Sequence, residues 1–324
     1  MTKADALKLT HINVSFAKIK DCAIYTKLKN LQYIKRIKEY NPKLKVIISV
    51  GGWGADGFSQ AASTDDNRKL FSKNIIEFMK KYYFDGIDLD WEYPCYGVGN
   101  IASSPEDKYN FTLLLEELRN QLNSEGLDKN IHYLLTIAVG ADEYYTDGTE
   151  MQNAHKYLDF IQLMTYDLRG GFQALTGHHT NLFTPTGDLF RISCDSSVNT
   201  FFRAGVPKEK LILGAAFYSR MWSGVPNVNN GLHQLAQTTG GAGPDFTDIK
   251  KDYINKNGFT RFWDDEAKSP YLFNGNEFIS YDDDESLKHK CDYIKENDLL
   301  GIMFWHYSAD ESGSLLNELV SSLT

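Results

Sequence analysis

Residues 84–94, Phe-Asp-Gly-Ile-Asp-Leu-Asp-Trp-Glu-Tyr-Pro, constrain the fold more than any other stretch of the chain. Successive side chains of a β-strand point to opposite faces, so Asp88, Asp90 and Glu92 share one face of the predicted strand. The residues between them are apolar, and Tyr93 and Pro94 end the strand. A solvent-exposed edge strand could alternate in the same way, but an apolar face that carries a tryptophan indicates a buried outer side. The acids would then face a cavity.

Carboxyl groups on one face of a strand are about 7 Å apart for each step of two residues. In a partly dry cavity, groups of like charge at that spacing cannot all stay ionised, so we expect at least one to hold a proton near neutral pH. A protonated carboxylic acid beside ionised carboxylates is the arrangement that general acid catalysis requires.

Length and charge limit the classes of protein that fit. The chain has 324 residues, of which 42% are hydrophobic, so it can fold as one barrel or as two smaller domains. Its net charge is −9 and no block of Lys and Arg appears, so we expect no nucleic-acid partner. Aromatic residues make up 13% of the chain, which suits a carbohydrate-binding protein because sugar rings stack on aromatic faces, although most of these rings must be core.

The spacing of the cysteines and the length of the apolar runs predict no structural metal site, no disulfide framework and no membrane-spanning segment. Cys22, Cys95, Cys194 and Cys291 lie far apart, without the spacing of a structural zinc site or a disulfide framework. No apolar run reaches the roughly 18 residues of a membrane span, so we expect no membrane partner. Residues 1–10 lack the apolar core of a signal peptide, which leaves the localisation unknown.

Predicted strands alternate with predicted helices along the chain. One-sided apolar patterns predict helices over 28–40, after the cap signals at 63–66, and around the stripe from Phe111 to Leu122. Strands separated by helices at intervals of about 35 to 50 residues favour βαβ units and a parallel sheet. The predicted strands are 9–17, 45–50, the acidic strand, 132–140, 159–167, 210–220 and 301–310.

These strands are one short of a (β/α)8 TIM barrel, which we favour as the fold class. The missing first strand belongs before Leu9, and we expect that upstream residues, with any export signal, were lost. The pattern lapses between the last two strands, where a structureless loop of that length is not expected. We therefore predict a small α+β insertion at 221–281 and a catalytic barrel formed by 1–220 and 282–324.

Once residues 85–92 are interpreted as acids at a strand end, they also match the DxxDxDxE signature of glycoside hydrolase family 18, the chitinases and their relatives. Further matches follow in the expected order and extend the resemblance over roughly residues 9–310. They are 49–53 (SVGGW, like SxGG), 162–167 (QLMTYD, like QxMxYD), 218–220 (YSR, like YxR) and 301–305 (GIMFW, like the final strand). The first strand of the family usually contributes a tyrosine, which this chain does not supply.

The resemblance implies retaining hydrolysis in which the sugar supplies its own nucleophile. Glu92 would protonate the glycosidic oxygen while the 2-acetamido carbonyl attacks the anomeric carbon to give an oxazolinium ion, and Glu92 would then activate water. Asp90 would orient the acetamido N–H and stabilise the developing charge, and Asp88 would share a proton with Asp90. Tyr166 would donate to the acetamido oxygen. No metal or organic cofactor is implied.

The resemblance also implies a set of substrate-binding residues. They are Trp53, Tyr93, Met164, Asp167, Tyr218, Arg220 and Trp305. Some have plainer alternatives: Met164 could fill a gap in the core, Trp305 could be a core residue rather than the floor of the sugar site, and Arg220 could pair with an acid near the rim. Asp85 has the opposite parity to the three acids, so we expect it to serve a turn or a backbone contact.

Three other motifs are rejected. Residues 52–57 fit G-x-G-x-x-G, but Trp53 crowds the turn and the predicted helix begins some six residues late for a dinucleotide site. The acidic run 282–285 lacks the glycine of a calcium-binding loop and predicts a solvated helix start. His178 and His179 have no further metal ligand nearby in sequence and resemble the family's GHH loop.

The function we expect is a chitinase, acting as a monomer on chitin or N-acetylglucosamine oligosaccharides. An endo-β-N-acetylglucosaminidase acting on glycoprotein or cell-wall glycans would share all the acids, and the predicted insertion favours the chitinase because a deep groove suits a linear polymer. A non-catalytic chitin-binding lectin is the alternative from another class. Such lectins typically lose the acid, whereas this chain keeps Glu92.

Overall fold

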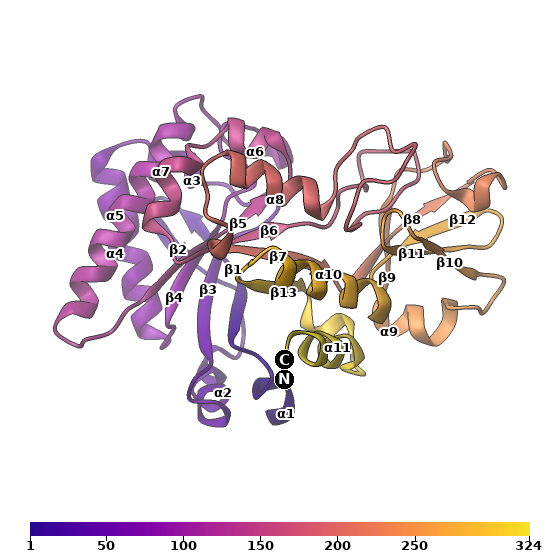
Figure 1. Ribbon diagram of the computed structural model, residues 1–324. Coiled ribbons are helices and arrows are strands. Elements are labelled where there is room, and N and C mark those ends of the chain that lie inside the picture. The colour runs from indigo at the N-terminus through magenta and orange to yellow at the C-terminus, as the bar shows by residue number, and fades with distance from the viewer. The chain divides into compact units, whose positions relative to one another are not determined.

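The computed structural model describes residues 1–324 and divides into two compact units (Figure 1). Unit 1 comprises Met1–Gln162 with Arg203–Val206, and unit 2 comprises Leu163–Phe202 with Pro207–Thr324. The boundary falls inside strand β6, Phe160–Met164. None of the helices has the length and hydrophobicity needed to cross a bilayer.

Unit 1 is built on parallel strands that pair in the order β5, β4, β3, β1, with β2 antiparallel to β1. The predicted strands are confirmed here, with ends that differ by a few residues. Their bounds are β1 His11–Lys20, β2 Ala23–Tyr25, β3 Lys45–Gly51, β4 Gly86–Asp90 and β5 Leu134–Gly140.

The long helix α4 of unit 1 begins where the cap signal at 63–66 predicts it. The Thr64 hydroxyl accepts a hydrogen bond from the Asn67 N–H at 3.2 Å and caps α4. Helices α4 and α5 lie side by side in Figure 1. The predicted helix over 28–40 begins only at Leu31, as a short 3₁₀ turn. The helices are α1 Lys3–Ala6, α2 Ile34–Tyr40, α3 Phe58–Ala62, α4 Asp65–Lys81, α5 Asp107–Leu127, α6 Glu143–Asp147 and α7 Met151–Ala154.

The apolar face of β4 is buried, as its alternation predicts. Ile87 and Leu89 are fully buried. The Trp91 ring stacks on Phe58 at 5.3 Å between centroids and meets Phe111 of α5 edge-on at 5.4 Å. Burying these large rings against two helices fixes which way the strand faces, because a slip by one residue would turn the acids into this apolar layer.

Unit 2 contains two parallel strands and a separate antiparallel sheet. Strands β7 Leu211–Ala216 and β13 Gly301–Trp305 pair in parallel. The antiparallel sheet has the order β10-β11-β12-β8-β9. Its strands are β8 Tyr218–Ser223, β9 Gly241–Asp245, β10 Thr260–Asp264, β11 Ser269–Phe273 and β12 Glu277–Ser280. The helices are α8 Cys194–Arg203, which ends in unit 1, α9 Phe246–Asp248, α10 Asp284–Glu296 and α11 Ser314–Leu323.

The predicted single strand over 210–220 is wrong, because the chain forms two strands there, β7 and β8, which belong to different sheets. Phe217 lies between them. Its N–H donates to the Trp305 carbonyl at 2.8 Å, its carbonyl accepts from Phe246 at 3.0 Å, and its ring stacks on Phe304. No glycine, proline or other turn residue stands between β7 and β8, so the sequence pattern runs on through the residue where the chain changes sheet. Tyr218 and Arg220 therefore lie on the antiparallel sheet rather than on a parallel strand.

Candidate active site

Asp88 is a buried carboxylate surrounded by neutral hydrogen-bond donors. Ser49 donates to Oδ2 at 2.7 Å, and Thr136 and Gln162 donate to Oδ1 at 2.6 Å and 2.9 Å. Asn13 in turn donates to the Gln162 side-chain carbonyl at 3.1 Å, which fixes that amide. Burial raises the pKa of Asp88, and the three donors oppose this shift because they stabilise the charged form.

Asp90 lies two residues further along β4 and has a different environment. It is buried, and its Oδ1 atom makes no hydrogen bond. Burial raises the pKa of Asp90 well above its usual range, the charges of Glu92 and Asp88 raise it further, and Lys18 opposes the shift. Asp90 therefore tends to hold a proton, or to share one with a neighbouring carboxyl, at pH values where an exposed aspartate is ionised. This is the crowding of acids that the sequence predicts.

Glu92 follows the end of β4 and is half-buried, beside an aromatic cluster of unit 1. The Tyr93 ring meets Tyr144 edge-on at 5.1 Å and Trp53 at 6.4 Å. Trp53 is 51% exposed, so its face is open for contact. Burial raises the pKa of Tyr93 well above its usual value and that of Tyr144 to about 12, so both phenols stay neutral and can act as hydrogen-bond donors.

Asp85 takes no part in this cluster. Its Oδ2 accepts a hydrogen bond from the backbone N–H of Val46 at 2.8 Å, and its Oδ1 pairs with Lys38 at 2.7 Å. The expected backbone contact is confirmed, and it ties the beginnings of β3 and β4 together.

In unit 2, Asp167 is held by an arginine and a tyrosine from β8. Arg220 donates from Nε to Oδ1 at 2.6 Å and from Nη2 to Oδ2 at 2.5 Å, and the Tyr218 hydroxyl donates to Oδ1 at 2.7 Å. Burial would raise the pKa of Asp167, but His179 and Arg220 outweigh it and hold the pKa well below the usual range. The plainer prediction for Arg220, an ion pair with an acid, is confirmed.

The remaining predicted residues of unit 2 lie at or after strand ends. Tyr166 follows β6, its hydroxyl lies 3.9 Å from the Met303 sulfur, and its ring meets Tyr218 edge-on at 6.0 Å. Met164 is the half-buried last residue of β6. Trp305 ends β13 and is 36% exposed, so it is not a fully buried core residue.

Four residues with structural roles around these aspartates were missed by the sequence reasoning. Ser49 and Thr136 are the direct register partners of Asp88 on β3 and β5. Polar residues at matching depth in otherwise apolar strands are the signal that would have identified them. Ser49 and Gln162 belong to segments that resemble family motifs, but no role was predicted for either. His179, interpreted as a metal ligand or as part of the family's GHH loop, is buried, and its Nδ1 accepts from the Asp167 N–H at 3.4 Å.

The acidic run starts a helix, as predicted. Asp283 caps α10 and accepts hydrogen bonds from the N–H groups of Glu285 and Ser286. Asp282 departs from the prediction of a solvated start, because it is fully buried in an ion pair with Lys290 at 2.6 Å. The prediction that a helix begins only some six residues after the glycine motif is also partly wrong, because the short α3 begins at Phe58, directly after Gly57.

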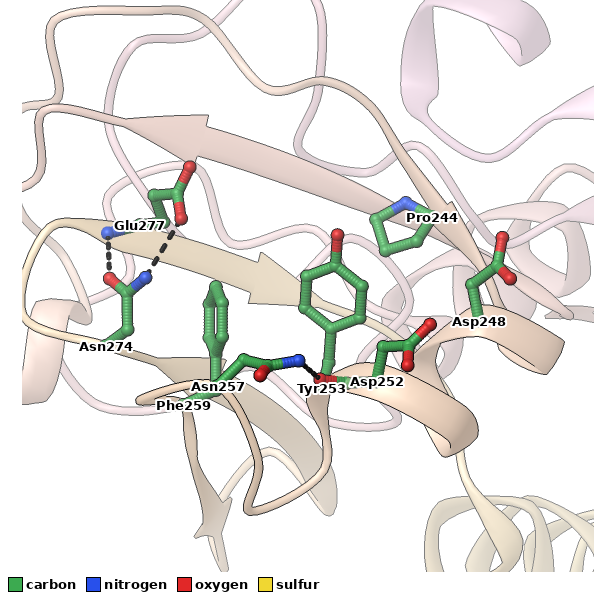
Figure 2. A pocket seen from close by; sticks show the side chains of 8 residues that line it. All are labelled: Pro244, Asp248, Asp252, Tyr253, Asn257, Phe259, Asn274 and Glu277. Atoms are coloured by element: carbon green, nitrogen blue, oxygen red, sulfur yellow. Dashed lines mark hydrogen bonds between the residues drawn. The ribbon is translucent and has the colours of Figure 1, made fainter.

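A pocket of about 570 Å³ opens on the antiparallel-sheet region of unit 2 (Figure 2). None of the predicted site residues lines it. Its polar walls are partly internally satisfied, since Asn274 donates to Glu277 at 2.9 Å and Asn257 donates to the Asp252 carbonyl at 2.8 Å. The lining residues are Pro244, Asp248, Asp252, Tyr253, Asn257, Phe259, Asn274 and Glu277.

Comparisons with known proteins define the class of this chain as a glycosyl hydrolase. The model of glycosyl hydrolases family 18 matches residues 2–310. The chain is 41% identical to Chitinase A1 of Niallia circulans over 315 residues, which are 91% of this chain and 44% of that protein. It is 33% identical to Chitotriosidase-1 of Mus musculus over 95% of this chain and 69% of that protein. The chain thus spans less than half the length of the first of these relatives.

Solved structures agree with the family model. A structure described as a novel glycoside hydrolase family 18 N-acetylglucosaminidase from Paenibacillus barengoltzii matches with a TM-score of 0.98 and 56% identity, over 100% of this chain and 96% of that one. The class V chitinase of Nicotiana tobaccum in complex with NAG4 matches with a TM-score of 0.88 and 27% identity, over 98% of this chain and 93% of that one. The chain belongs to glycosyl hydrolases family 18, and its fold is TIM-barrel-like.

Proposed function

We propose that this protein is a chitinase that hydrolyses β-1,4-linked N-acetylglucosamine polymers with retention, using Glu92 as the acid and base. The observation that carries the proposal is the contrast along β4: Asp88 accepts three hydrogen bonds, whereas Oδ1 of the buried Asp90 accepts none. A buried acceptor without a protein partner fits an N–H donor supplied by the substrate. The names of the relatives, among them Chitinase A1 and the class V chitinase, support the same substrate class.

The proposed first step transfers the proton of Glu92 to the glycosidic oxygen as the bond to the anomeric carbon breaks. The acetamido carbonyl oxygen of the same sugar forms the new bond to that carbon, which gives an oxazolinium ion. Asp90 accepts a hydrogen bond from the acetamido N–H and stabilises the positive charge of the oxazolinium ion. Strand β4 fixes the position of Asp90. Asp88, held by three donors, acts on Asp90 through its charge. Water then attacks the anomeric carbon and gives a proton to Glu92, while the bond between that carbon and the acetamido oxygen breaks.

We assign the residues of unit 2 to recognition of the sugar. Tyr166 would donate to the acetamido oxygen, and Asp167, fixed by Arg220 and Tyr218, would accept a sugar hydroxyl. The exposed face of Trp305 would carry a sugar ring, and Met164 would shape the acetamido pocket. In unit 1, Trp53 and Tyr93 would line flanking subsites. The insertion at 221–281, which would wall a groove for a linear polymer, stays a prediction. The missing first barrel strand and the monomeric state also stay predictions.

A second candidate is an N-acetylglucosaminidase that acts on short or glycoprotein-linked substrates. It is favoured by one observation, the 56% identity to the Paenibacillus barengoltzii enzyme described by that name. The two candidates share the chemistry of Glu92 and differ in the substrate. Product analysis on chito-oligomers of increasing length separates them, because a chitinase releases chito-oligosaccharides from within or from the end of a long chain, whereas an N-acetylglucosaminidase releases the monosaccharide.

The test of the proposed chemistry is Glu92→Gln, assayed on chromogenic N-acetylglucosaminide, chitobioside and chitotrioside. We expect kcat to fall by about 10²–10⁴-fold, because the amide cannot transfer a proton. Glu39→Gln is the matched control, since Glu39 is exposed on α2 of the same unit. Unchanged turnover in Glu92→Gln would remove Glu92 as the acid. Binding of chito-oligomers without any turnover by the intact protein would favour the lectin.

A further inference from the structure

Lys18 is a cation at the edge of the acid cluster that the proposed mechanism does not use. It lies near the end of β1 and is half-buried. Its Nζ atom donates to the carbonyl oxygen of Gly51 at 2.7 Å, and it lies 5.4 Å from the centre of the Phe16 ring. A long, flexible side chain that is anchored at its tip in this way has one defined position rather than several.

The anchor of Lys18 is the part of β3 that lies directly beside Asp90. Gly51 is the register partner of Asp90, and the Gly52 N–H donates to the Asp90 carbonyl at 2.9 Å. The approach is so close that a Cβ atom on Gly51, whose φ is +124°, would lie 1.9 Å from the Asp90 carbonyl oxygen. No side chain of β3 can therefore lie beside Asp90 at this position. A positive charge beside Asp90 has to come from the next strand, β1.

The charges that act on Lys18 are the carboxyl groups of Asp90 and Glu92 on the β4 segment. On β3 its hydrogen bond goes to the Gly51 carbonyl, and on β2 its register partner is the phenol Tyr25. Burial lowers the pKa of Lys18, and the two acids oppose that shift. In return Lys18 lowers the pKa of Asp90, against burial and the charges of Glu92 and Asp88. The other titratable groups near these acids are the neutral phenols of Tyr93, Tyr144 and Tyr145.

We propose that Lys18 is a positioning residue of the site, a fixed ammonium group that offsets the charge of Asp90 and Glu92 and so determines how many protons this pair holds at working pH. The inference rests on the proposed function, in which Glu92 must carry a proton while the charge on Asp90 is retained. Without the cation the pair gains a second proton at a higher pH, because a nearby positive charge stabilises the ionised carboxylate.

The test compares the pH dependence of kcat/KM in the wild type, Lys18→Met, Lys18→Arg and Lys20→Met. Methionine keeps most of the length and removes the charge, arginine keeps the charge, and Lys20 is an exposed control on the same strand. We expect both limbs of the profile of Lys18→Met to move to higher pH by about half a unit to one unit. Lys18→Arg and Lys20→Met keep the wild-type profile. A loss of activity in Lys18→Met that is equal at every pH would overturn the proposal, since it would indicate only a structural role at Gly51.

A second measurement separates this inference from the proposed function. The carboxyl carbons of Asp90 and Glu92 are titrated by NMR in the labelled wild type and in Lys18→Met, with Asp90→Asn and Glu92→Gln for assignment. An upward shift of the titration in Lys18→Met supports the role of Lys18 even if no N-acetylglucosamine substrate is cleaved, in which case the proposed function fails alone. An active wild type with identical titrations in both proteins leaves the proposed function intact and refutes the role of Lys18.

Discussion

Two aspartates of unit 2 and two aspartates on β4 of unit 1 differ in which groups stabilise their carboxyl groups. In unit 2, Asp167 is paired with Arg220 at 2.5 Å, and the fully buried Asp282 is paired with Lys290 at 2.6 Å. In unit 1, Asp88 has only neutral donors and Oδ1 of Asp90 has none. A direct cation keeps a carboxylate ionised, whereas burial without one favours the protonated form. The difference indicates that Asp167 and Asp282 of unit 2 serve as structural anions, whereas Asp88 and Asp90 on β4 of unit 1 stay able to exchange a proton.

Buried acids without a cation and buried acids paired with one affect the stability of the folded protein differently. A carboxyl whose pKa is raised on folding destabilises the folded state at neutral pH, because the unfolded chain ionises it freely. Such a group persists where chemistry needs it, and strongly shifted acids are concentrated at functional sites. The buried Asp282 of unit 2 is different, since removing Lys290 leaves a buried charge without compensation.

The largest effect on stability is expected from Lys290→Met. It leaves Asp282 buried beside an apolar side chain, and breaking a buried ion pair by removing one partner costs about 3–5 kcal/mol. Urea unfolding measures the loss. Lys288→Met, on the exposed face of the same helix, is the control and should change stability little. The double variant Asp282→Asn/Lys290→Met should recover part of the loss, and a single variant as stable as the wild type would contradict the role given to this pair.

Asp90→Asn should have the opposite effect on stability and a large effect on activity. Loss of the charge that stabilises the oxazolinium ion should lower kcat by about 10²–10³-fold. The folded-state pKa of Asp90 is raised, so its destabilising effect is absent below the unfolded value near pH 4 and develops as pH rises above it. Asparagine removes this effect, so Tm at pH 7 should rise by roughly 2–4 °C, and the gain should vanish near pH 3.

Thermal unfolding at the two pH values, with Asp147→Asn as an exposed control, measures the stability change of Asp90→Asn. A variant that loses both activity and stability at pH 7 would show that Asp90 is a structural anion like Asp282. The difference between the two units would then disappear.

A smaller effect is expected from Ser49→Ala, which removes one of the three donors to Asp88. The two remaining donors keep the carboxyl in place, so the loss of one hydrogen bond should destabilise the protein by about 1–2 kcal/mol at pH 7. Burial raises the folded-state pKa of Asp88 and the donors oppose that shift, so the loss should shrink as pH falls through this raised value and be smallest at pH 3, where the group is protonated in both states. Unfolding at pH 7 and pH 3 tests this, and Ser63→Ala, whose hydroxyl donates to the backbone carbonyl of Gln60, should not show the same pH dependence.

Ser49 also shows how far the sequence could predict the site. Alternation along one strand was enough to predict that Asp88 and Asp90 share a buried face, because the period of a strand is fixed by backbone geometry. The donors come from other strands, and their identity depends on register, Ser49 and Thr136 opposite Asp88, which one strand does not encode. Lys18 reaches the site through a long side chain past Phe16, which no pattern reveals.

Much of the fold could also be predicted from local periodicity. The prediction was wrong where distant partners decide the structure. Helix and strand periods differ, so the alternation of the two along the chain indicated parallel strands, and those of unit 1 are confirmed. The change of sheet at Phe217 was missed because no turn residue separates the two extended strands beside it. Only the partners of Phe217, Trp305 and Phe246, distinguish a strand end from a strand interior, and both are distant in sequence.

The smallest effect on stability is expected from Arg220→Met, which tests the comparison from the side of unit 2. The Arg220–Asp167 pair is partly solvated, with the Asp167 side chain 41% exposed, so screening reduces its contribution to at most about 1 kcal/mol. The folded-state pKa of Asp167 is depressed, so this contribution is present above the unfolded value near pH 4 and is lost as pH falls below it. Thermal unfolding of Arg220→Met and Arg220→Lys at pH 7 and pH 3 measures it.

Lysine keeps the charge but not the two parallel hydrogen bonds of Arg220, so Arg220→Lys should retain part of the stability at pH 7. If both variants instead lose activity far more than stability, the fixed anion of unit 2 acts on substrate through its position, as proposed for Asp167. If either variant gains stability at pH 7, Asp167 behaves as Asp90 does, and the division between structural and proton-exchanging acids does not follow the two units.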